Sequence, residues 1–359
     1  MARGRLHAVI LAGGAGERFW PASRQKHPKP FLRVVDGRSL LDATLARARR
    51  FASRDSVWVV CGKEHARAIR RSTGLPASRV LVEPRRRNTA MAVAFAAQHI
   101  ADADPRGVLA VLPADHRIPD AGAFAAAMRR AARAARAEGA LVTLGVEPTR
   151  IETGYGYIQV GKAVGREHPG LRRVRRFVEK PSVAKARRYA KQGGFLWNAG
   201  IFVFQARSML DEVERCAPDL HRALAPLRKS PGARSGRAVE RAYRLAPSLP
   251  IDVAVMERSR TVWTLPVTFR WSDVGTWLSL AEELGVSSGK TKLIGGELLF
   301  DELGGNLVWG DRRGVALLGV EGLAVIDTPD VLLVTQLDGS PAVRKIVAEL
   351  KRRRRTDVT

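Results

Sequence analysis

The chain has 359 residues, of which 45% are hydrophobic and 27% charged, and this composition argues for a folded protein with a sizeable core and against disorder. The formal net charge of +26 suggests nucleic-acid binding, but the basic residues are scattered along predicted helices, so we expect solvated helix faces and no nucleic-acid partner. The two cysteines, Cys61 and Cys216, lie far apart in the sequence, which argues against a disulfide scaffold or a zinc site. No apolar run approaches the roughly 18 residues of a membrane span, so we expect a cytoplasmic protein without a membrane partner.

The first half of the chain alternates short apolar runs, typical of buried strands, with segments of helical character. Strands are expected at residues 6–12, 56–61, 79–82, 108–112 and 140–145. Helices are expected at residues 40–51, 64–72, 90–103 and 123–138. This alternation predicts an α/β domain with a mostly parallel sheet that is covered on both faces. Ligands of such a domain bind at the carboxyl ends of the strands.

From Ile151 onward the alternation loosens into glycine-rich strands and insertions. Further strands are expected at residues 154–160, 174–180 and 199–205. Because the composition does not change at this point, we expect the same domain to continue with a second, mixed set of strands.

The apolar pattern gives way to Gly, Ser and Lys near residues 285–292, which predicts a boundary between a large domain, 1–285, and a small module, 290–359. Short Val/Leu strands separated by turn signals over residues 295–334 suggest a β module, and residues 341–353 predict a closing helix. The basic block at residues 351–355 fits a frayed tail or a weak contact with a polyanion equally well.

The first predicted strand runs into a turn that contains Gly13, Gly14 and Gly16 and is followed by Arg18 and Lys29. Glycines after a buried strand let backbone N–H groups approach a phosphate, and the two basic side chains can neutralise its charge. A simple tight turn is the alternative. The loop lacks the Lys-Ser/Thr ending of a P-loop and the G-x-G-x-x-G spacing, which argues against an ATPase or a dehydrogenase.

The loop at residues 13–18, with Trp20-Pro-x-Ser-Arg and Pro28-Lys29 after it, resembles the fingerprint of the sugar nucleotidyltransferases, specifically the guanylyltransferases that act on mannose 1-phosphate. The resemblance implies a Rossmann-like, GT-A-like domain with a β-helix-like C-terminal module. It implies that the loop and Arg18 hold the nucleoside triphosphate and that Lys29 stabilises charge between the α-phosphate and pyrophosphate. Pro30 stands where a glutamine is common in the family.

Two aspartates follow strand-like runs, Asp115 after residues 108–112 and Asp273 in a Trp-Ser-Asp-Val-Gly segment. Alone, Asp115 would more often cap a loop or helix. Both match metal-binding positions of the family, so the resemblance implies that together they hold one Mg²⁺, for which Mn²⁺ or Co²⁺ can substitute, against the triphosphate. A small set of oxygen ligands suits Mg²⁺, which completes its shell with phosphates and water. We expect His116 to be a neighbour and not a ligand.

Glu83 follows another predicted strand and precedes Asn88 and Thr89, either of which is placed to cap the next helix. A capped helix explains the Asn and Thr but not the Glu. The Glu-Pro and Arg-Asn-Thr-Ala pattern resembles the base-recognition segment of the guanylyltransferases, in which a carboxylate accepts hydrogen bonds from guanine.

Three segments, at residues 153–158, 177–181 and 197–202, match the family in order and spacing, and residues 251–257 also fit it. By resemblance, Gly156 offers backbone contacts, Glu179 accepts hydrogen bonds from sugar hydroxyls, Lys180 holds the sugar phosphate and Asn198 contacts the sugar. Asp252 is implied as a sugar contact or as a residue that supports one.

The resemblance covers roughly residues 6–277 and implies that the substrates are GTP and mannose 1-phosphate. It implies an in-line attack of the sugar phosphate on the α-phosphorus, with the release of pyrophosphate and formation of GDP-mannose. The small C-terminal module often lies at a dimer interface in the family, so a homodimer is expected. Two alternatives stay open: a nucleotidyltransferase for another base or another sugar phosphate, such as a manno-heptose 1-phosphate, and a non-catalytic regulatory homologue.

Overall fold

The computed structural model describes residues 4–14, 16–35, 37–229, 236–311 and 313–359. The contacts within the chain divide it into two compact units, each assembled from several stretches of sequence. Unit 1 contains the stretch that ends at Gly13, Thr44–Ala114 and Ile118–Trp271, and unit 2 contains Gly14–Ala43, Asp115–Arg117 and Ser272–Thr359. The domain limits expected from the sequence stay a prediction.

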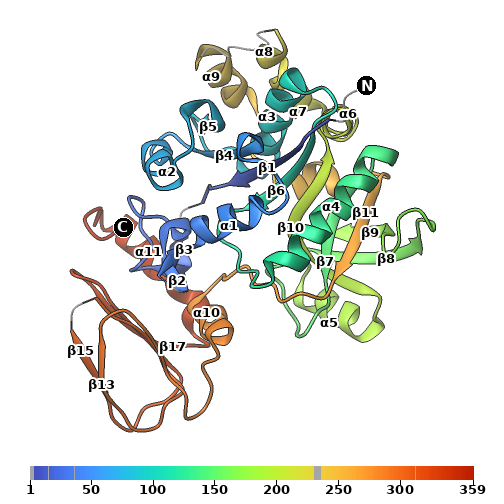
Figure 1. Cartoon of the computed structure of the whole chain (residues 1–359). Coiled ribbons are helices and arrows are strands. Elements are labelled where there is room, and N and C mark those ends of the chain that lie inside the picture. Colours follow the sequence, from blue (N-terminus) through green and yellow to red (C-terminus); the bar gives the residue numbers. More distant parts are fainter. Residues whose placement is uncertain (1–3, 15, 36, 230–235, 312) are drawn as a thin grey trace. The chain divides into compact units, whose positions relative to one another are not determined.

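Unit 1 is built on a nine-stranded sheet with the order β5-β4-β1-β6-β10-β7-β11-β9-β8 (Figure 1). Its strands are β1 (Leu6–Leu11), β4 (Val57–Gly62), β5 (Val80–Glu83), β6 (Val108–Pro113), β7 (Leu141–Val146), β8 (Tyr157–Ala163), β9 (Arg172–Val178), β10 (Phe195–Gln205) and β11 (Val262–Val267). Strands β5, β4, β1 and β6 run parallel to one another, as do β7 and β11, whereas β10 lies antiparallel between β6 and β7. The α/β class with a mixed sheet, predicted from the sequence, is confirmed.

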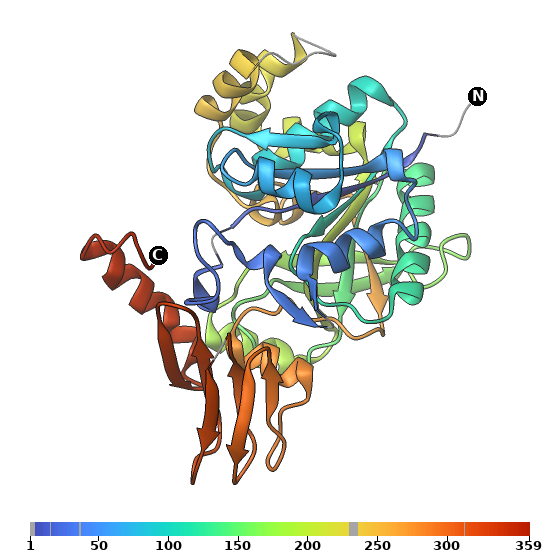
Figure 2. The ribbon, with the colours of Figure 1, turned by 60° about the vertical axis from the view of Figure 1, so that its left-hand side comes forward.

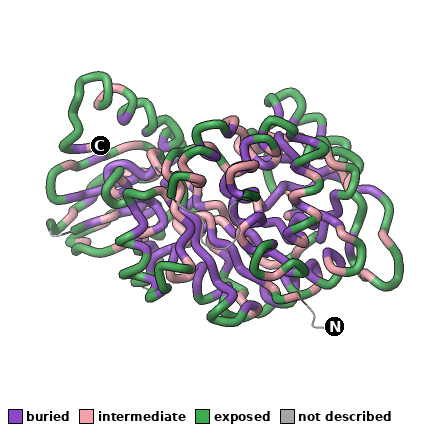
Figure 3. Tube along the Cα trace, turned by 90° about the horizontal axis from the view of Figure 1, so that it is seen from above, coloured by how far each residue is buried: buried purple, intermediate pink, exposed green. Residues whose placement is uncertain are grey.

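The helices of unit 1 cover both faces of this sheet (Figure 2). They are α2 (Ala66–Thr73), α3 (Asn88–Ala103), α4 (Ala121–Glu138), α5 (Val183–Gln192), α6 (Ala206–Cys216), α7 (Pro218–Ala223), α8 (Ala225–Arg228) and α9 (Gly236–Leu245), and α1 (Leu40–Ala48) spans the division between the units. Val9 packs into the core that contains α3, and its strand neighbours Ala8 and Ile10, which point to the opposite face, are also completely buried. Figure 3 marks such buried stretches in purple.

The sequence did not predict β11 or the helices α6 to α9 that precede it. The helices α6 and α9 are amphipathic, so their apolar residues are spaced along one face and do not form the continuous apolar runs on which the sequence prediction relied. No helix among the described residues is long and apolar enough to cross a membrane.

The C-terminal part of unit 2 has the stacked parallel strands of a β-helix. Strands β12 (Lys292–Ile294), β14 (Leu307–Trp309) and β16 (Leu323–Asp327) pair in parallel, as do β13 (Glu297–Asp301) and β15 (Gly314–Leu317), and β17 (Leu332–Gln336) pairs antiparallel with β16. At one corner Gly296 has a positive φ of 64°, and an added Cβ would lie 2.9 Å from the Cα of Gly310 in the next turn. The predicted β-helix-like module is confirmed.

The rest of unit 2 joins the glycine-rich loop to the end of the chain. It contains the short helices η1 (Glu17–Phe19) and η2 (Lys29–Phe31), the hairpin of β2 (Arg33–Val35) and β3 (Arg38–Ser39), and the helices α10 (Trp277–Leu284) and α11 (Val343–Arg352). Phe19, Trp20 and Trp277 pack in one core with residues of α11 and of the β module. The indole N–H of Trp20 donates to the carbonyl of Val358, at 2.7 Å. The predicted closing helix is therefore present, and it packs beside the loop.

Candidate active site

The glycine-rich loop folds back on Lys29 at Gly16, where only glycine fits. Gly16 has a φ of 62°, in the left-handed region. An added Cβ would lie 2.5 Å from the Cβ of Lys29 and 2.7 Å from Oγ of Ser23. Gly14 also has a positive φ, of 104°. Two of the three predicted loop glycines are therefore required by the backbone itself.

Lys29 is the most buried of the predicted catalytic residues, with 7% of its surface exposed. Its Nζ donates to Oδ2 of Asp115 at 2.7 Å and to the backbone carbonyl of Asp273 at 2.8 Å. Burial alone would raise the pKa of Asp115, but the charges of Lys29 and His116 outweigh it and hold that pKa below its usual value. Asp115 is therefore ionised at neutral pH, and Lys29 is fixed in place beside it.

The predicted catalytic residues, which all belong to unit 2, line one pocket of about 440 Å³. Arg18, Lys29, Asp115 and Asp273 all contribute to its wall. The other lining residues are Gly16, Glu17, Phe19, His116, Gly275 and Arg344. Two carboxylates and several cations on one wall suit a polyphosphate that carries a bound cation.

The two aspartates of this pocket fit a divalent metal ion. Gly275 leaves room for the Asp273 carboxylate, because an added Cβ would lie 2.9 Å from its Oδ2. Asp115 is ionised, as a metal ligand must be. Two carboxylates are few for an all-protein site but suffice for Mg²⁺ that is also bound by substrate phosphates. Among the described residues, the one group of three clustered metal-binding side chains is Glu138, Glu167 and His168, none of which was predicted as a site residue.

Glu83 is the last residue of β5, at the carboxyl end of the parallel strands of unit 1, and is half-buried. Burial raises the pKa of its carboxyl to about 7, although the neighbouring Tyr243 hydroxyl lowers it. Gly13 lies beside it, since an added Cβ would be 3.9 Å from Oε2 of Glu83. The structure therefore places two of the predicted nucleotide-binding residues next to each other.

The predicted side-chain cap of α3 by Asn88 or Thr89 is wrong. Arg87 occupies the capping position and its side chain forms no cap hydrogen bond. Asn88 has a positive φ of 60°, and its Oδ1 accepts the N–H of Thr89. Oγ1 of Thr89 instead accepts the N–H of Ile251, at 2.9 Å, which ties the start of α3 to a segment distant in the sequence. A long-range hydrogen bond replaced the local one that the pattern suggested.

The predicted sugar-binding residues lie together in unit 1. The carbonyl of Gly156 accepts the N–H of Asn198 at 2.8 Å. An added Cβ at Gly156 would lie 2.8 Å from Oε2 of Glu179 and 3.3 Å from the Cβ of Asn198, so a side chain at Gly156 would clash with both. Three segments far apart in the sequence thus meet at Gly156.

Asn198 and Asp252 form a hydrogen-bonded pair in the same place. Asn198 sits at a bulge of β10, donates from Nδ2 to Oδ1 of Asp252 at 2.8 Å and accepts a bond from Thr143. Asp252 begins a π-helical turn, η5 (Asp252–Met256), a feature frequent at functional sites. Burial and the neighbouring Glu179 carboxylate raise the pKa of Asp252 to about 7. Asp252 therefore belongs to this cluster.

Lys180 follows β9 in a strained backbone conformation, with a positive φ of 44°. Its exposed ammonium lies 2.8 Å from Oε1 of Glu179. The backbone N–H of Glu179 donates to Oε1 of Glu257 at 2.8 Å, which holds the turn. The sequence had not singled out Glu257, because an exposed acid in a helical run carries no pattern that distinguishes it.

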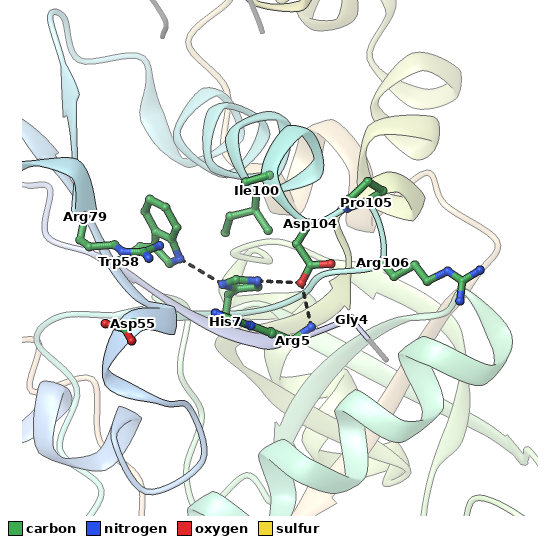
Figure 4. A pocket seen from close by; sticks show the side chains of 11 residues that line it. Gly4, Arg5, His7, Asp55, Trp58, Arg79, Ile100, Asp104, Pro105 and Arg106 are labelled. Atoms are coloured by element: carbon green, nitrogen blue, oxygen red, sulfur yellow. Dashed lines mark hydrogen bonds and ion pairs between the residues drawn. The ribbon is translucent and has the colours of Figure 1, made fainter. Parts of the chain in front are cut away.

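A larger pocket of unit 1, of about 540 Å³, contains none of the predicted site residues (Figure 4). His7 lies at its centre, where it accepts the indole N–H of Trp58 and bonds to Asp104. Burial lowers the pKa of His7. The pocket lies where β1 and β4 begin, and ligands of parallel sheets bind at the opposite ends of the strands, so we assign it no part in catalysis.

Two family models match the sequence. One, described as nucleotidyl transferase, covers residues 7–285, and one described as a MannoseP isomerase/GMP-like beta-helix domain covers residues 302–350. The mannose-1-phosphate guanylyltransferase of Salmonella typhimurium is 37% identical over 97% of this chain and 73% of its own length. That of Escherichia coli is 34% identical over 98% of this chain and 74% of its own length.

A crystal structure from Thermus thermophilus, described as a mannose-1-phosphate geranyltransferase, has 35% sequence identity and a TM-score of 0.88. The match covers 97% of this chain and 99% of that one. Because relatives at these identities match nearly the whole chain, it belongs to the nucleotidyl transferase family, among the mannose-1-phosphate guanylyltransferases.

Proposed function

We propose that this chain transfers GMP from GTP to α-D-mannose 1-phosphate, giving GDP-mannose and pyrophosphate. The observation that carries the proposal is the contact of Lys29 with Asp115 and with the Asp273 carbonyl, in a pocket also lined by Arg18. A fixed, buried ammonium beside ionised carboxylates suits a triphosphate whose charge shifts during reaction. The activity named for the Salmonella and E. coli relatives supports the same assignment.

The chemical step needs no covalent intermediate. A phosphate oxygen of mannose 1-phosphate attacks the α-phosphorus of GTP, and an oxygen–phosphorus bond forms as the bond to the pyrophosphate oxygen breaks. Pyrophosphate leaves with the electron pair. No base is required, because the attacking phosphate monoester is already anionic at pH 7. Positioning and electrostatic stabilisation by Lys29 and Arg18 supply the catalysis.

Asp115 and Asp273 would hold one Mg²⁺ against the triphosphate. When bound, the ion neutralises phosphate charge and polarises the phosphoryl oxygens. The contact of Lys29 with Oδ2 of Asp115 orients that carboxylate, and the contact with the Asp273 carbonyl fixes the backbone that carries the second one.

The residues of unit 1 are assigned to the base and the sugar. Glu83 accepts hydrogen bonds from the guanine N1–H and amino group, and the segment of Asn88 and Thr89 is assigned to the nucleotide. In the cluster around Gly156, we assign Glu179, Asn198 and Asp252 to the sugar and Lys180 to its phosphate.

A substrate panel tests the function. Pyrophosphate release is measured with GTP, ATP, dTTP, UTP and CTP, each against the 1-phosphates of mannose, glucose and manno-heptose. GTP with mannose 1-phosphate should have the highest kcat/KM. A higher value for another pair would reassign the site to a related transferase, and no release with any pair would favour the non-catalytic alternative.

Preference for guanine should depend on Glu83 and on pH. Binding a base that leaves the Glu83 carboxylate without a hydrogen-bond donor costs about 1 to 3 kcal/mol of binding free energy. We therefore expect kcat/KM for GTP to exceed that for ATP by at least about tenfold at pH 8. Only the ionised carboxylate accepts both guanine donors. Because the pKa of Glu83 is raised to about 7, the carboxyl is mostly protonated below pH 7 and must lose its proton before it can accept both guanine donors. The GTP/ATP ratio should therefore fall by about tenfold between pH 8 and pH 6.

The ratio is the appropriate measurement because the triphosphates of GTP and ATP titrate alike. Glu83→Gln should lower the ratio and remove its dependence on pH, whereas Glu214→Gln, which removes an exposed acid of α6 that does not act on the pKa of Glu83, should keep both the preference and its slope. A ratio that stays constant with pH in the wild type would contradict the role of Glu83.

We further propose a homodimer that forms through the β-helix-like module. The support is apolar exposure on and beside the sheet of β13 and β15, where Leu299 is 62% and Leu318 is 73% exposed. Large exposed apolar patches mark contact surfaces. Sedimentation of the full chain should give twice the monomer mass, and Leu299→Glu with Leu318→Glu should give the monomer. Val183→Glu, an exposed apolar residue of unit 1, should leave the dimer intact, and a monomeric wild type at micromolar concentration would refute the proposal.

A further inference from the structure

Arg344 follows β17, the last strand of the β-helix-like module, and it lines the pocket of about 440 Å³ that contains Lys29, here termed the phosphate pocket. It is the second residue of α11 and lines the pocket with Arg18, Lys29 and the two aspartates. No motif surrounds it, and the sequence had assigned the residues after 290 no part in the chemistry. The C-terminal helix therefore contributes a cation to the same pocket as the glycine-rich loop.

The helix α11 is held firmly in unit 2, so that the place of Arg344 is determined. Val343 and Val347 are buried in the core that contains Phe19 and Trp277. Just before the helix, the Oγ of the fully buried Ser340 accepts the N–H of Leu278, at 3.1 Å. Arg344 thus projects from the first turn of an anchored helix.

Arg18 and Arg344 differ from Lys29 in their partners. Lys29 is buried and bonded to Asp115. The side chains of Arg18 and Arg344 are exposed, and neither side chain forms a hydrogen bond or an ion pair with any other residue that the structure describes. Both guanidinium groups line the same pocket, and an anion bound there would neutralise the like charges. Their planar fork matches phosphate oxygens better than an ammonium does.

We propose that Arg344 binds the terminal phosphates of the nucleoside triphosphate, and pyrophosphate in the reverse reaction. The proposal rests on the proposed function in assigning the triphosphate to this pocket. The reacting α-phosphate belongs beside Lys29 and the carboxylates, which are fixed and partly buried. The phosphates that leave as pyrophosphate then lie toward the exposed arginines. The C-terminal helix is thereby a part of the triphosphate site.

The test uses the full chain with three variants, Arg344→Ala, Arg344→Lys and Lys345→Ala. Lys345 is the matched control, because it is an exposed cation on the same helix that does not line the pocket. With Mg²⁺ present, we expect Arg344→Ala to weaken the binding of inorganic tripolyphosphate by about tenfold or more, as for the loss of a charge-assisted contact. Arg344→Lys should recover part of this loss, and Lys345→Ala should match the wild type.

Steady-state kinetics test whether Arg344 contacts the phosphates that leave as pyrophosphate. Arg344→Ala should raise the KM for GTP in the forward direction and the KM for pyrophosphate in the reverse direction by about tenfold, and should change the KM for GDP-mannose by less than about twofold. Equal behaviour of Arg344→Ala and Lys345→Ala in tripolyphosphate binding would overturn the proposal, as would a rise in the KM for GDP-mannose equal to that for pyrophosphate.

Tripolyphosphate carries neither base nor sugar, which separates this proposal from the proposed function. If the wild type failed to use GTP and mannose 1-phosphate but bound tripolyphosphate through Arg344, the function would be wrong and the phosphate contact right. If the wild type made GDP-mannose while Arg344→Ala bound tripolyphosphate normally, the proposed function would be right and the phosphate contact of Arg344 wrong.

Discussion

Replacing Asp115 or Asp273 by Asn is expected to lower kcat/KM by at least about a hundredfold, on the order of 3 kcal/mol of transition-state stabilisation. Each carboxylate supplies one of only two protein ligands for the proposed metal ion, so the loss of either loosens the ion. The two variants differ in a useful way. Asp115→Asn also weakens the bond with Lys29, whereas Asp273→Asn leaves the bond of Lys29 to the Asp273 backbone carbonyl in place.

The double variant tests whether the aspartates share one ion. The second substitution has less left to remove, so the double variant should lose far less than the product of the two single losses. Excess chelator should abolish turnover of the wild type, and added Mg²⁺ should restore it. Asp338→Asn, which changes an exposed acid of unit 2 outside the pocket, should keep wild-type activity. Strictly multiplicative losses, or full activity in chelator, would show that no ion is shared.

Replacing Lys180 by Ala is expected to lower kcat/KM for mannose 1-phosphate by up to about a hundredfold, mainly through a higher KM for the sugar phosphate. Lys180 adopts a positive φ of 44°, a strained conformation that places its ammonium 2.8 Å from Oε1 of Glu179. Strain of this kind persists where the surroundings enforce it, often at ligand sites. The surroundings here include the hydrogen bond between Glu257 and the backbone of Glu179.

The KM for GTP should change by less than about threefold in the same variant, since the lost contact is to the sugar phosphate and not to the triphosphate. Lys185→Ala is the matched control, because Lys185 is exposed on the nearby helix α5 and lies outside the cluster. If the KM for GTP rose while that for mannose 1-phosphate stayed constant, Lys180 would belong to the nucleotide side.

Local patterns in the sequence predicted the fold class and most of the segments that contain site residues. Alternation of apolar runs with helical stretches predicted β1, β4, β5, β6 and β7 nearly at their observed limits, because strand and helix periodicities are properties of neighbouring residues. The same logic failed for the capping of α3. Asn88 and Thr89 fit the local pattern of a cap, but Thr89 bonds to Ile251, a partner that no local pattern contains.

The sequence by itself determined which residue types are present for phosphate, metal and sugar chemistry, and the order in which they follow the strands. Only the tertiary structure decided the pKa values of these residues and which residues lie next to them. The low pKa of Asp115 arises from Lys29 and His116, and the raised pKa of Asp252 arises from burial and from Glu179, which lies far away in the chain. Arg344 likewise reaches the phosphate pocket only because α11 packs beside the glycine-rich loop. Such properties depend on distances through space and on the exclusion of water, and neither is set until the chain has packed.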